Sequence, residues 1–476
     1  MLSKNDFFSL FKKQLHYSPT NGQSEAMELL SEFVCLNIKN QLLILRGYAG
    51  TGKTTLISAL VQTLKMVDKK TVLLAPTGRA AKVFSVYSNQ KAYTIHKHLY
   101  KVKIKDGMLD FFRKENKMRD TLFIVDEVSM LSASIQSGTL FANKSLLEDL
   151  IEYVFEGENC RMIFIGDDAQ LPPVHSTESP ALVTDYLMKN FNLNAISFQL
   201  TEVVRQALDS GILFNANILR NKILQGDFRY PVFSGKNFDD YIRVNGSELE
   251  ELLNTLYAKY DSDEIVVITR SNKRAFIFNS EIRKRILFRE NQISTGDYIM
   301  AVKNNYYWVD STSEIGFIAN GDIMEIMAIK KIEELYGFMF ADVSVRLCDY
   351  PNFQQIDIKI IIDSLETDGP SLPGEKMSAL YQEISLDYQH ISNKKIRYLK
   401  MKNDPYLNAL QVKFSYSLTC HKTQGGQWKI VLIDQGYIKE ENIDTEYFRW
   451  LYTAITRASE KVFLINFDKI MFANPE

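Results

Sequence analysis

One eight-residue segment restricts the fold of this 476-residue chain more than any other. Residues 47–54 read GYAGTGKT, follow an apolar run at residues 42–45 and precede a helical pattern over residues 55–64. A strand, a glycine loop and a helix in this order are the context of a phosphate-binding loop. Glycines let backbone N–H groups turn toward one anion, and the helix start adds its positive dipole end. A glycine-rich turn that binds nothing is the alternative, and it explains the context less well.

The loop assigns roles to individual residues. Lys53 would reach the β- and γ-phosphates of a nucleoside triphosphate, and Thr54 would bind Mg²⁺. The other expected nucleotide-binding residues here are Gly47, Gly50, Gly52 and Thr55. The sequence therefore predicts NTP binding, and the rest of the chain must indicate what the NTP drives.

Length and composition set broader limits. A chain this long is expected to form two to four domains, and 46% hydrophobic residues are typical of a soluble globular protein. The formal charge of −2 and the pI of about 6.4 argue against broad coating of duplex DNA, so a nucleic-acid site must be a local groove. The four cysteines form no C-x-x-C pair, and we find no signal-peptide or membrane-spanning pattern. We therefore expect a soluble, cytoplasmic protein without a zinc site.

Alternating apolar runs and helical patterns between residues 41 and 205 predict a parallel sheet covered by helices. The expected strands are residues 41–46, 71–75, 121–125, 162–165 and 196–200. A second, thinner series predicts another α/β domain without a phosphate loop. Its expected elements are strands at 264–269, 429–433 and 462–465 and a helix near 272–289.

The pattern changes between residues 297 and 410, where short antiparallel strands predict a small β-barrel inserted in the second α/β domain. The expected strands are residues 297–303, 316–318, 323–330 and 338–347. Residues 376–400 read as one polar helical stretch that could be an arm, a contact surface or an outer helix. The predicted domains are 1–200, then 201–296 together with 411–476, and the insert 297–410.

Residues 99–118 contain a predicted β-hairpin, because basic and apolar residues alternate before the turn signal Asp106-Gly107. It would carry Lys101, Lys103 and Lys105 on one face, near Phe111 and Phe112. This hairpin could be a wedge that faces DNA or an ordinary surface hairpin, and the local sequence favours neither.

Acidic residues follow two of the expected strands. Asp126 and Glu127 end the run at 123–125, where Asp126 can hold the Mg²⁺ shell and Glu127 can polarise the attacking water. The next strand ends in Gly166-Asp167-Asp168, and Gln170 after it could sense a γ-phosphate or be merely structural. Arg205 and Arg457 are candidates to balance charge in the transition state, although sequence spacing alone does not distinguish them from surface arginines.

Taken in order, these motifs resemble the full motif series of a superfamily 1 DNA helicase, most closely the RecD/Dda-like branch that moves 5′-to-3′. The segments that carry the resemblance are Gln23 and residues 47–55, 75–81, 94–97, 126–127, 166–173, 200–206, 417–425 and 452–458. Together they extend over residues 20–470. The residues after Gln170 lack the aromatic-rich continuation of the 3′-to-5′ branch, which supports the 5′-to-3′ assignment by family.

The resemblance implies two RecA-like domains, an SH3-like barrel at 297–410 and a strand-separating wedge at the hairpin. It implies ATP and Mg²⁺ as cofactors, with Gln23 on the adenine and Gln170, Arg205 and Arg457 converging on the γ-phosphate. Gln424 and Gly425 would couple the nucleotide to DNA. The residues expected along single-stranded DNA are Pro76, Thr77, His96, Thr419 and His421.

We therefore expect an ATP-dependent helicase that acts as a monomer on single-stranded DNA and on junctions with duplex. Two other functions fit parts of the sequence. One is a translocase that displaces proteins without separating strands, and the other is an NTP-dependent switch protein. RNA is also possible as a track, because stacking and phosphate contacts tolerate either sugar.

Overall fold

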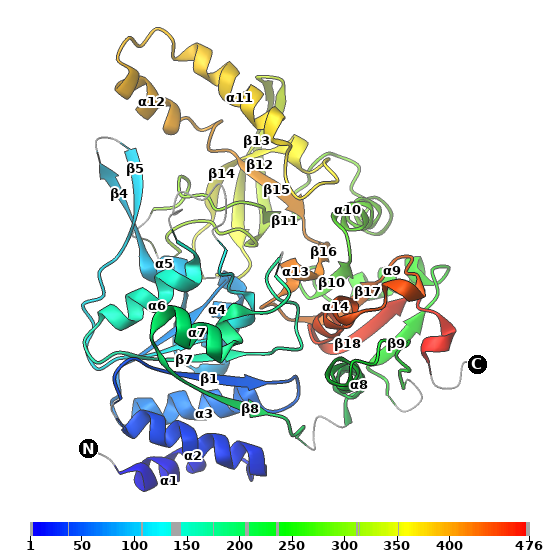
Figure 1. Ribbon diagram of the computed structural model, residues 1–476. Coiled ribbons are helices and arrows are strands. Elements are labelled where there is room, and N and C mark those ends of the chain that lie inside the picture. The colour runs from blue at the N-terminus through cyan, green and yellow to red at the C-terminus, as the bar shows by residue number, and fades with distance from the viewer. Residues whose placement is uncertain are drawn as a thin grey trace.

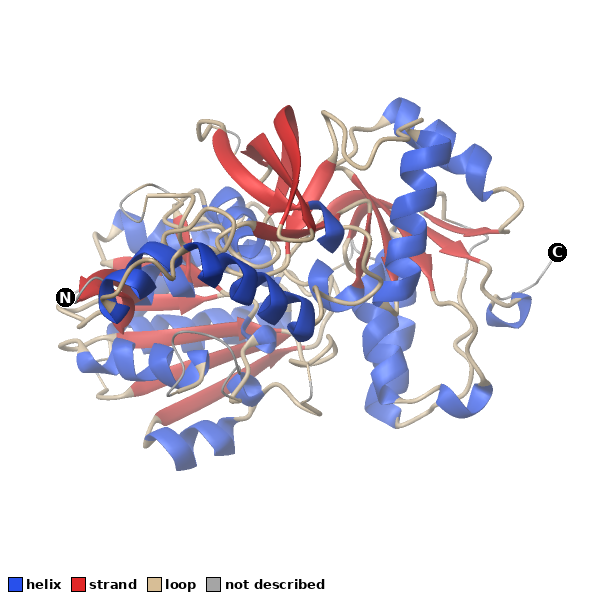
Figure 2. Ribbon diagram, turned by 90° about the horizontal axis from the view of Figure 1, so that it is seen from above, coloured by secondary structure: helices blue, strands red, loops and turns tan. Residues whose placement is uncertain are grey.

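The computed structural model describes residues 3–36, 38–105, 108–134, 144–174, 176–204, 209–234, 238–310, 313, 315–350 and 352–472, with the side chains of 102–105 and 108–111 left out. Two lobes lie side by side in both views, and a barrel with a helical arm adjoins them (Figures 1 and 2). Among the described residues, no helix combines the length and apolar character needed to cross a membrane.

The first lobe is built on a six-stranded parallel sheet in the order β3-β2-β6-β7-β1-β8. Its strands are β1 (Gln41–Gly47), β2 (Thr71–Ala75), β3 (Ala92–Thr94), β6 (Leu122–Val125), β7 (Arg161–Gly166) and β8 (Asn194–Leu200). All five strands expected from the sequence are present, and β3 is an addition of three residues.

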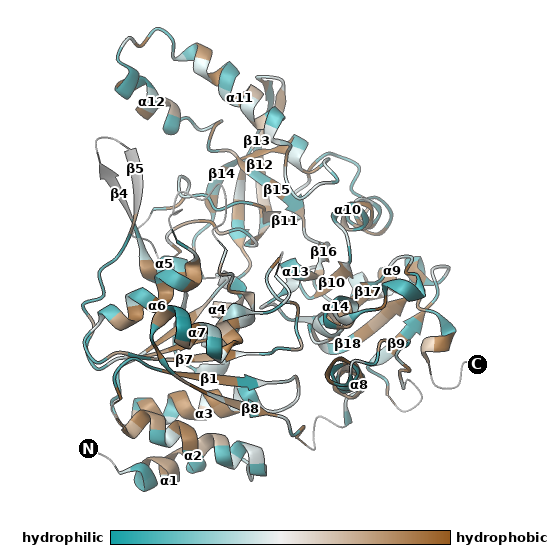
Figure 3. Cartoon of the chain, in the orientation of Figure 1, coloured by the Kyte–Doolittle hydropathy of each residue, from teal (hydrophilic) through white to brown (hydrophobic). Residues whose placement is uncertain are grey.

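Helices cover both faces of this sheet because successive strand residues point to opposite sides. On β1, Leu43 and Leu45 face the core that contains α1–α4, whereas Leu42 and Ile44 face the core that contains α5–α7. The helices are α1 (Lys4–Lys13), α2 (Asn21–Cys35), α3 (Lys53–Met66), α4 (Gly78–Ser88), α5 (Ile95–Leu99), α6 (Leu146–Glu156) and α7 (Thr184–Phe191). The central strands, buried on both sides, are largely apolar runs, and Figure 3 shows hydrophobic residues concentrated on strands such as β1. The edge strand β8 is half-buried and includes polar residues.

The second lobe repeats this plan with a five-stranded parallel sheet in the order β16-β10-β17-β18-β9. The strands are β9 (Tyr241–Val244), β10 (Ile265–Thr269), β16 (Ser417–Thr419), β17 (Trp428–Asp434) and β18 (Ala458–Ile465). The helices are α8 (Gly211–Gln225), α9 (Leu249–Lys259), α10 (Asn272–Glu281), α13 (Cys420–Thr423) and α14 (Thr445–Ile455). A π-helical turn at Ile282–Ile286 continues α10, so the expected helix near 272–289 is present but irregular.

The insert is a closed five-stranded barrel, as predicted. Its strands are β11 (Tyr298–Ala301), β12 (Ile323–Leu335), β13 (Phe338–Leu347), β14 (Ile356–Ile361) and β15 (Leu410–Phe414). Since β15 closes the barrel and ends at Phe414, the insert extends past the predicted boundary at residue 410.

One further prediction for the insert was wrong, and a second was right in its helical character. Residues 316–318 form no strand, only an isolated bridge from Ile318 to Asn305, because the chain turns at once. Residues 376–400 form two helices, α11 (Gly374–Asp387) and α12 (Lys394–Lys402). A new N-terminus at α12 separates them, where the Asn393 side chain accepts hydrogen bonds from two backbone N–H groups.

The predicted hairpin is present as β4 (Tyr100–Lys105) paired antiparallel with β5 (Met108–Arg113). It projects from the first lobe on the side of the arm (Figure 1). Its expected turn, Asp106-Gly107, lies outside the described residues.

A fully buried carboxylate joins the second lobe to the barrel. Asp297, with no exposed surface, accepts from Arg283 at 2.9 Å and Arg289 at 2.7 Å and from the Tyr416 hydroxyl at 3.0 Å. Such a charge is tolerated in a core only when its oxygens are paired in this way.

Candidate active site

A cavity of about 470 Å³ lies at the seam of the two lobes. Because the carboxyl ends of parallel strands meet at one edge of a sheet, the loops after β1, β6 and β7 all reach it. The first lobe contributes Lys53, Thr54, Thr55, Asp126, Glu127, Asp167 and Gln170, and the second contributes Gln427, Thr456, Arg457 and Ser459.

The glycine loop connects β1 to α3 as expected. Gly50 and Gly52 have φ of +76° and +79°, a left-handed backbone that favours glycine. A side chain at Gly52 would also come within 2.4 Å of the Gln23 amide nitrogen. The loop is tightened by the Thr51 hydroxyl, which donates to the Tyr48 carbonyl at 2.8 Å.

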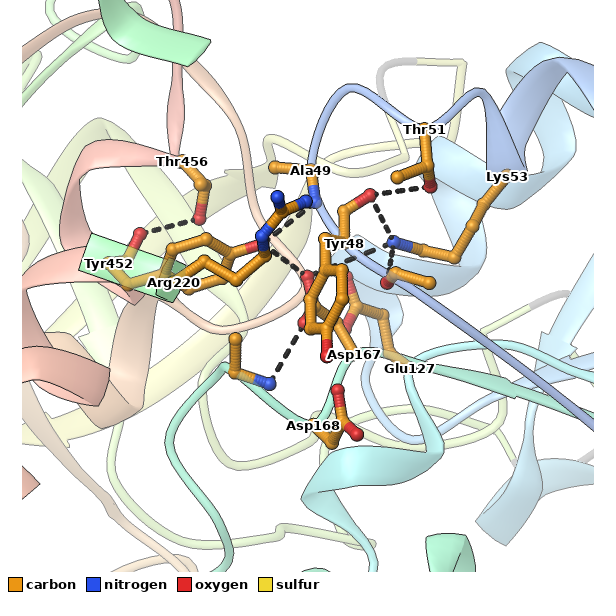
Figure 4. A network of polar contacts seen from close by, with 12 residues as sticks. Tyr48, Ala49, Thr51, Lys53, Glu127, Asp167, Asp168, Arg220, Tyr452 and Thr456 are labelled. Atoms are coloured by element: carbon orange, nitrogen blue, oxygen red, sulfur yellow. Dashed lines mark hydrogen bonds and ion pairs between the residues drawn. The ribbon is translucent and has the colours of Figure 1, made fainter. Parts of the chain in front are cut away.

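Lys53 lies over this loop. Its ammonium donates to the carbonyls of Gly47 and Tyr48, the latter at 3.0 Å, and lies 3.8 Å from an Asp167 carboxylate oxygen (Figure 4). Thr54 and Thr55, in the first turn of α3, are exposed in the cavity. The charge and the helix N-terminus therefore face one space, which suits a polyphosphate.

The acidic pair lies opposite. Asp126 accepts from the Tyr87 hydroxyl at 2.6 Å and from the Glu127 N–H at 2.8 Å. Glu127 has φ of +54°, an uncommon backbone for a residue other than glycine. Burial raises the pKa of both carboxyl groups, a change that Arg457 opposes at Glu127.

Arg457 enters the cavity from the second lobe, just before β18. The side chain is 5% exposed, donates to the carbonyls of Thr453 and Gly426, and lies 3.9 Å from a Glu127 carboxylate oxygen. The other expected arginine, Arg205, lies outside the described residues. Val204, immediately before it, lines the cavity and donates to the Gly50 carbonyl at 3.0 Å.

The turn after β7 links the lobes. Gln170 lines the cavity, and the next residue, Leu171, is held from both sides. Its carbonyl accepts from the Gln424 amide at 2.7 Å, and its N–H donates to the Thr453 hydroxyl at 2.9 Å.

Tyr452 is a site residue that the sequence analysis did not single out, although it stands in the quoted segment 452–458. Its hydroxyl accepts from the Ala49 N–H and donates to Asp167, both at 2.7 Å, and the residue is 1% exposed (Figure 4). Ala49 belongs to the glycine loop, so helix α14 of the second lobe contacts the loop directly. A pairing across some 400 residues has no local sequence signal.

The comparisons with known proteins agree with this geometry. Residues 20–213 match the family described as AAA domain, and residues 414–465 match the UvrD-like helicase C-terminal domain. The ATP-dependent DNA helicase dda of Enterobacteria phage T4 is 29% identical over 324 residues, 65% of this chain and 67% of dda. The RecBCD enzyme subunit RecD of Buchnera aphidicola (subsp. Schizaphis graminum) is 23% identical over 503 residues, 99% of this chain and 78% of that subunit. The two family matches and both relatives together support a superfamily 1 DNA helicase of the RecD/Dda-like branch.

Among solved structures, this helicase matches the Bacteroides Pif1 helicase in complex with ADP-AlF₃ and single-stranded DNA. The identity is 16%, the TM-score is 0.48, and the match covers 97% of this chain and 95% of that one.

The resemblance places Gln23 on the adenine, whereas the contacts observed for its side chain are with the protein itself. Its side chain closes a capping box with Thr20 at the start of α2, and its amide donates to the Thr51 carbonyl at 3.0 Å. Gln23 thus supports the phosphate loop, and its contact with adenine stays a prediction.

The residues expected along DNA follow the carboxyl ends of strands in both lobes. Pro76 and Thr77 follow β2, His96 follows β3, and Thr419 and His421 lie at the end of β16. Burial lowers the pKa of His96 to about 4, so its imidazole is neutral at pH 7. Their contact with single-stranded DNA stays a prediction.

Gly425 brings the lobes together beside this row. Its φ is +73°, and a Cβ there would lie 2.8 Å from the Ala80 Cβ and 3.1 Å from the Thr77 hydroxyl. Only glycine lets the second lobe approach the N-terminus of α4 this closely.

On the hairpin, Lys101 is exposed and pairs in register with Phe112, which is half-buried. The side chains of Lys103 and Phe111 lie outside the described part, so their predicted contact with DNA remains a prediction.

Proposed function

We propose that this helicase hydrolyses ATP with Mg²⁺, moves 5′-to-3′ along single-stranded DNA and separates duplex ahead of it. The observation that carries the proposal is the seam cavity, where Lys53, Glu127 and Gln170 of the first lobe face Arg457 of the second. A site assembled from two lobes can couple nucleotide chemistry to their relative position.

The oxygen donors present suit Mg²⁺. The Thr54 hydroxyl and the Asp126 carboxylate border one cavity, and hard oxygen ligands in small number, completed by phosphate and water, are what Mg²⁺ prefers. When bound, Mg²⁺ would neutralise charge on the β- and γ-phosphates.

Each of these side chains then has a role in ATP hydrolysis. Glu127 accepts a proton from the attacking water, whose oxygen forms a bond to the γ-phosphorus. The bond from that phosphorus to the β–γ bridging oxygen breaks, and its electron pair remains on ADP. Lys53 and Arg457, with Arg205 as a further expected cation, balance the charge of the transferring group, and Gln170 contacts it.

Movement follows from closure of the seam. The triphosphate attracts the second-lobe arginine, and hydrolysis removes part of this attraction. Because Gln424 donates to Leu171, next to Gln170 of the cavity, and Gly425 packs against the α4 N-terminus, closure would shift the residues expected to hold the strand. The relatives support the activity, since one is named an ATP-dependent DNA helicase, and the 5′-to-3′ direction follows from the resemblance to the RecD/Dda-like branch.

The first experiment replaces Lys53 with Ala. We expect DNA-stimulated ATP hydrolysis to fall by ~10³-fold or more, because the lysine contacts the phosphates in the transition state, while binding of single-stranded DNA persists. A variant that turns over ATP normally would overturn the phosphate-loop assignment.

The second experiment uses forked duplexes with one single-stranded tail, either 5′ or 3′. We expect unwinding only with the 5′ tail. Translocation along single strands without duplex separation would identify a protein-displacing translocase, and ATP hydrolysis indifferent to DNA would identify a switch protein. RNA tails in the same assay measure whether the sugar is discriminated.

A further inference from the structure

A second cavity, of about 220 Å³, adjoins the nucleotide cavity at Gln170, which lines both. The charged residues around it are Arg46 at the end of β1, Asp168 after β7, Glu178, and Arg449 of α14. Like the nucleotide cavity, it is therefore built from both lobes.

The walls of this cavity contain polar atoms that lack partners. Four of the eleven buried side-chain atoms without a hydrogen bond in the described residues lie here: Arg46 Nε, Arg449 Nε, Gln170 Oε1 and Asp168 Oδ1. Gln170 is only 7% exposed. Because an unpaired buried polar atom loses its hydrogen bonds to water without replacement, such a cluster indicates a polar occupant.

The unpaired atoms specify the chemistry of that occupant. Two guanidinium N–H groups require acceptor oxygens, and they favour an oxyanion. An amide oxygen and a carboxyl oxygen can accept from a hydroxyl on the same group. Burial, with Asp167 nearby, raises the pKa of Asp168, which reduces its repulsion of an anion. A hydrogen phosphate ion carries both acceptor oxygens and an O–H donor.

We propose that this second cavity, which we call the phosphate cavity, receives inorganic phosphate as it leaves the nucleotide cavity past Gln170. The proposal rests on the proposed ATP hydrolysis, which generates phosphate beside that glutamine.

The lobes would control the exit. Arg449 comes from the second lobe and donates to the Thr177 carbonyl of the first at 2.7 Å. Arg46 lies 3.9 Å from Asp168, a loose pair that can open to an anion. Separation of the lobes would withdraw Arg449 and release the ion, so phosphate departure would accompany the mechanical step.

The test uses Arg46→Gln and Arg449→Gln, which remove charge on two different elements, with Arg449→Lys as the conservative variant. The control is Arg119→Gln, an exposed first-lobe arginine paired with Glu158 at 2.8 Å and remote from both cavities. Thermal unfolding of each variant verifies the fold.

Two measurements distinguish the binding of added orthophosphate from the release of phosphate cleaved from ATP. Binding of ³²P-labelled orthophosphate to the full chain with ADP present reports the cavity directly. Rapid quench of γ-³²P-ATP against a fluorescent phosphate sensor reports the delay between cleavage and release.

We expect wild type and Arg119→Gln to bind orthophosphate and to release cleaved phosphate after a lag. Each Gln variant should bind orthophosphate about tenfold more weakly and lose the lag with unchanged cleavage, and Arg449→Lys should be intermediate. Unchanged orthophosphate affinity and lag in both folded Gln variants would overturn the phosphate cavity. Failure of the proposed function would instead appear as absent cleavage in wild type, and orthophosphate binding would still decide this inference.

Discussion

Glu127 owes its place in the cavity to its backbone. A residue in extended conformation after β6 would direct its side chain toward one face of the sheet, but Glu127, with φ of +54°, reaches the seam, where Arg457 lies 3.9 Å away. Strained residues of this kind concentrate at functional sites. Burial raises the pKa of Glu127 above that of an ordinary glutamate, the guanidinium of Arg457 opposes the rise, and a raised pKa makes the carboxylate a stronger base.

We predict that Glu127→Gln lowers ATP hydrolysis by about 10²–10⁴-fold while ATP binding is retained, because the amide keeps the shape but cannot take the proton. Phosphate release under saturating ATP and single-stranded DNA measures the rate, and equilibrium binding of a fluorescent ATP analogue is the control. In wild type the rate should fall as pH decreases through the pKa of Glu127, which lies above that of an ordinary glutamate. Hydrolysis by the Gln variant at the wild-type rate would contradict the role.

Tyr452 offers the sharpest test of contact between the lobes. Its hydroxyl is the buried link between Ala49 of the phosphate loop and helix α14, and Asp167 depends on it as well. We predict that Tyr452→Phe lowers stability by about 1–3 kcal/mol, because the buried Asp167 loses a donor, and reduces the stimulation of ATP hydrolysis by DNA more than the rate without DNA.

The matched control is Tyr447→Phe on the same helix. The Tyr447 hydroxyl donates to Gln435 at 2.7 Å within the second lobe, so its loss should lower the melting temperature but leave DNA stimulation intact. Equal effects of both substitutions on stimulation would show that Tyr452 stabilises the fold without coupling the lobes.

At the scale of elements, the hydrophobic pattern along the chain predicted those strands that are themselves apolar runs. The sequence located the five longer strands of the first sheet within two residues at either end, because four of them (β1, β2, β6 and β7) are largely apolar runs that are buried in the sheet. The edge strand β8 is only half-buried, but it still carries Ile196, Phe198 and Leu200 in alternation. The three-residue β3, and β9 with its central Arg243, carry no such run and depend on neighbouring strands. Strand β15 could not be assigned to the barrel because the arm separates it in sequence from β14.

The site shows the same division. The loop and the acids were found because spacing along the chain determines them, whereas Arg457 was assigned only through the resemblance to the helicase family. Their arrangement around Tyr452, Tyr87 and the phosphate cavity depends on contacts between segments that are far apart in the sequence. Such contacts leave no local pattern from which they could be predicted.

The turn before β12 makes a pH-dependent contact with α4. Asp322 is 4% exposed, accepts from the Ala319 N–H at 2.7 Å and lies against Gly78, where a Cβ would approach within 2.9 Å. Burial raises its pKa from 3.8 to about 7. Between these values the folded state holds a proton that the unfolded chain has released, so the contribution of Asp322 to stability is present below pH 4 and is lost as pH rises to 7.

We therefore predict that Asp322→Asn stabilises the protein relative to wild type more at pH 8 than at pH 5. Asparagine keeps an acceptor for Ala319 without the buried charge. The full shift corresponds to about 4 kcal/mol, an upper limit for this difference. Melting temperatures at the two pH values, with the more exposed barrel acid Asp342 changed to Asn as control, measure it; a difference that does not grow with pH would contradict the buried charge.

At the scale of the whole molecule, helix α4 links three bodies. Arg79 donates to the Gln427 carbonyl and stacks 3.8 Å over Trp428 of the second lobe, and Lys82 donates to the Cys348 carbonyl of the barrel. Thr77, at the start of the same helix, is expected on DNA. The second lobe, the barrel and the expected DNA contact thus meet on one short element, which makes strong energetic coupling between nucleotide and DNA sites a physical expectation.

Coupling of this kind is reciprocal. We predict that a non-hydrolysable ATP analogue changes the affinity for single-stranded DNA by roughly 5- to 150-fold, and that the DNA changes the affinity for the analogue by the same factor. Arg457→Ala should remove most of this factor, because Arg457 is the described second-lobe cation closest to Glu127, while the intrinsic affinity for DNA stays within about twofold in the absence of nucleotide. Fluorescence anisotropy measures the affinity for DNA, and calorimetry measures the affinity for the analogue. The control for charge is Arg285→Ala, at a side chain that is 62% exposed. If Arg457→Ala kept the full factor, the lobes would be coupled through another contact, and Tyr452 with Asp167 would be the next pair to test.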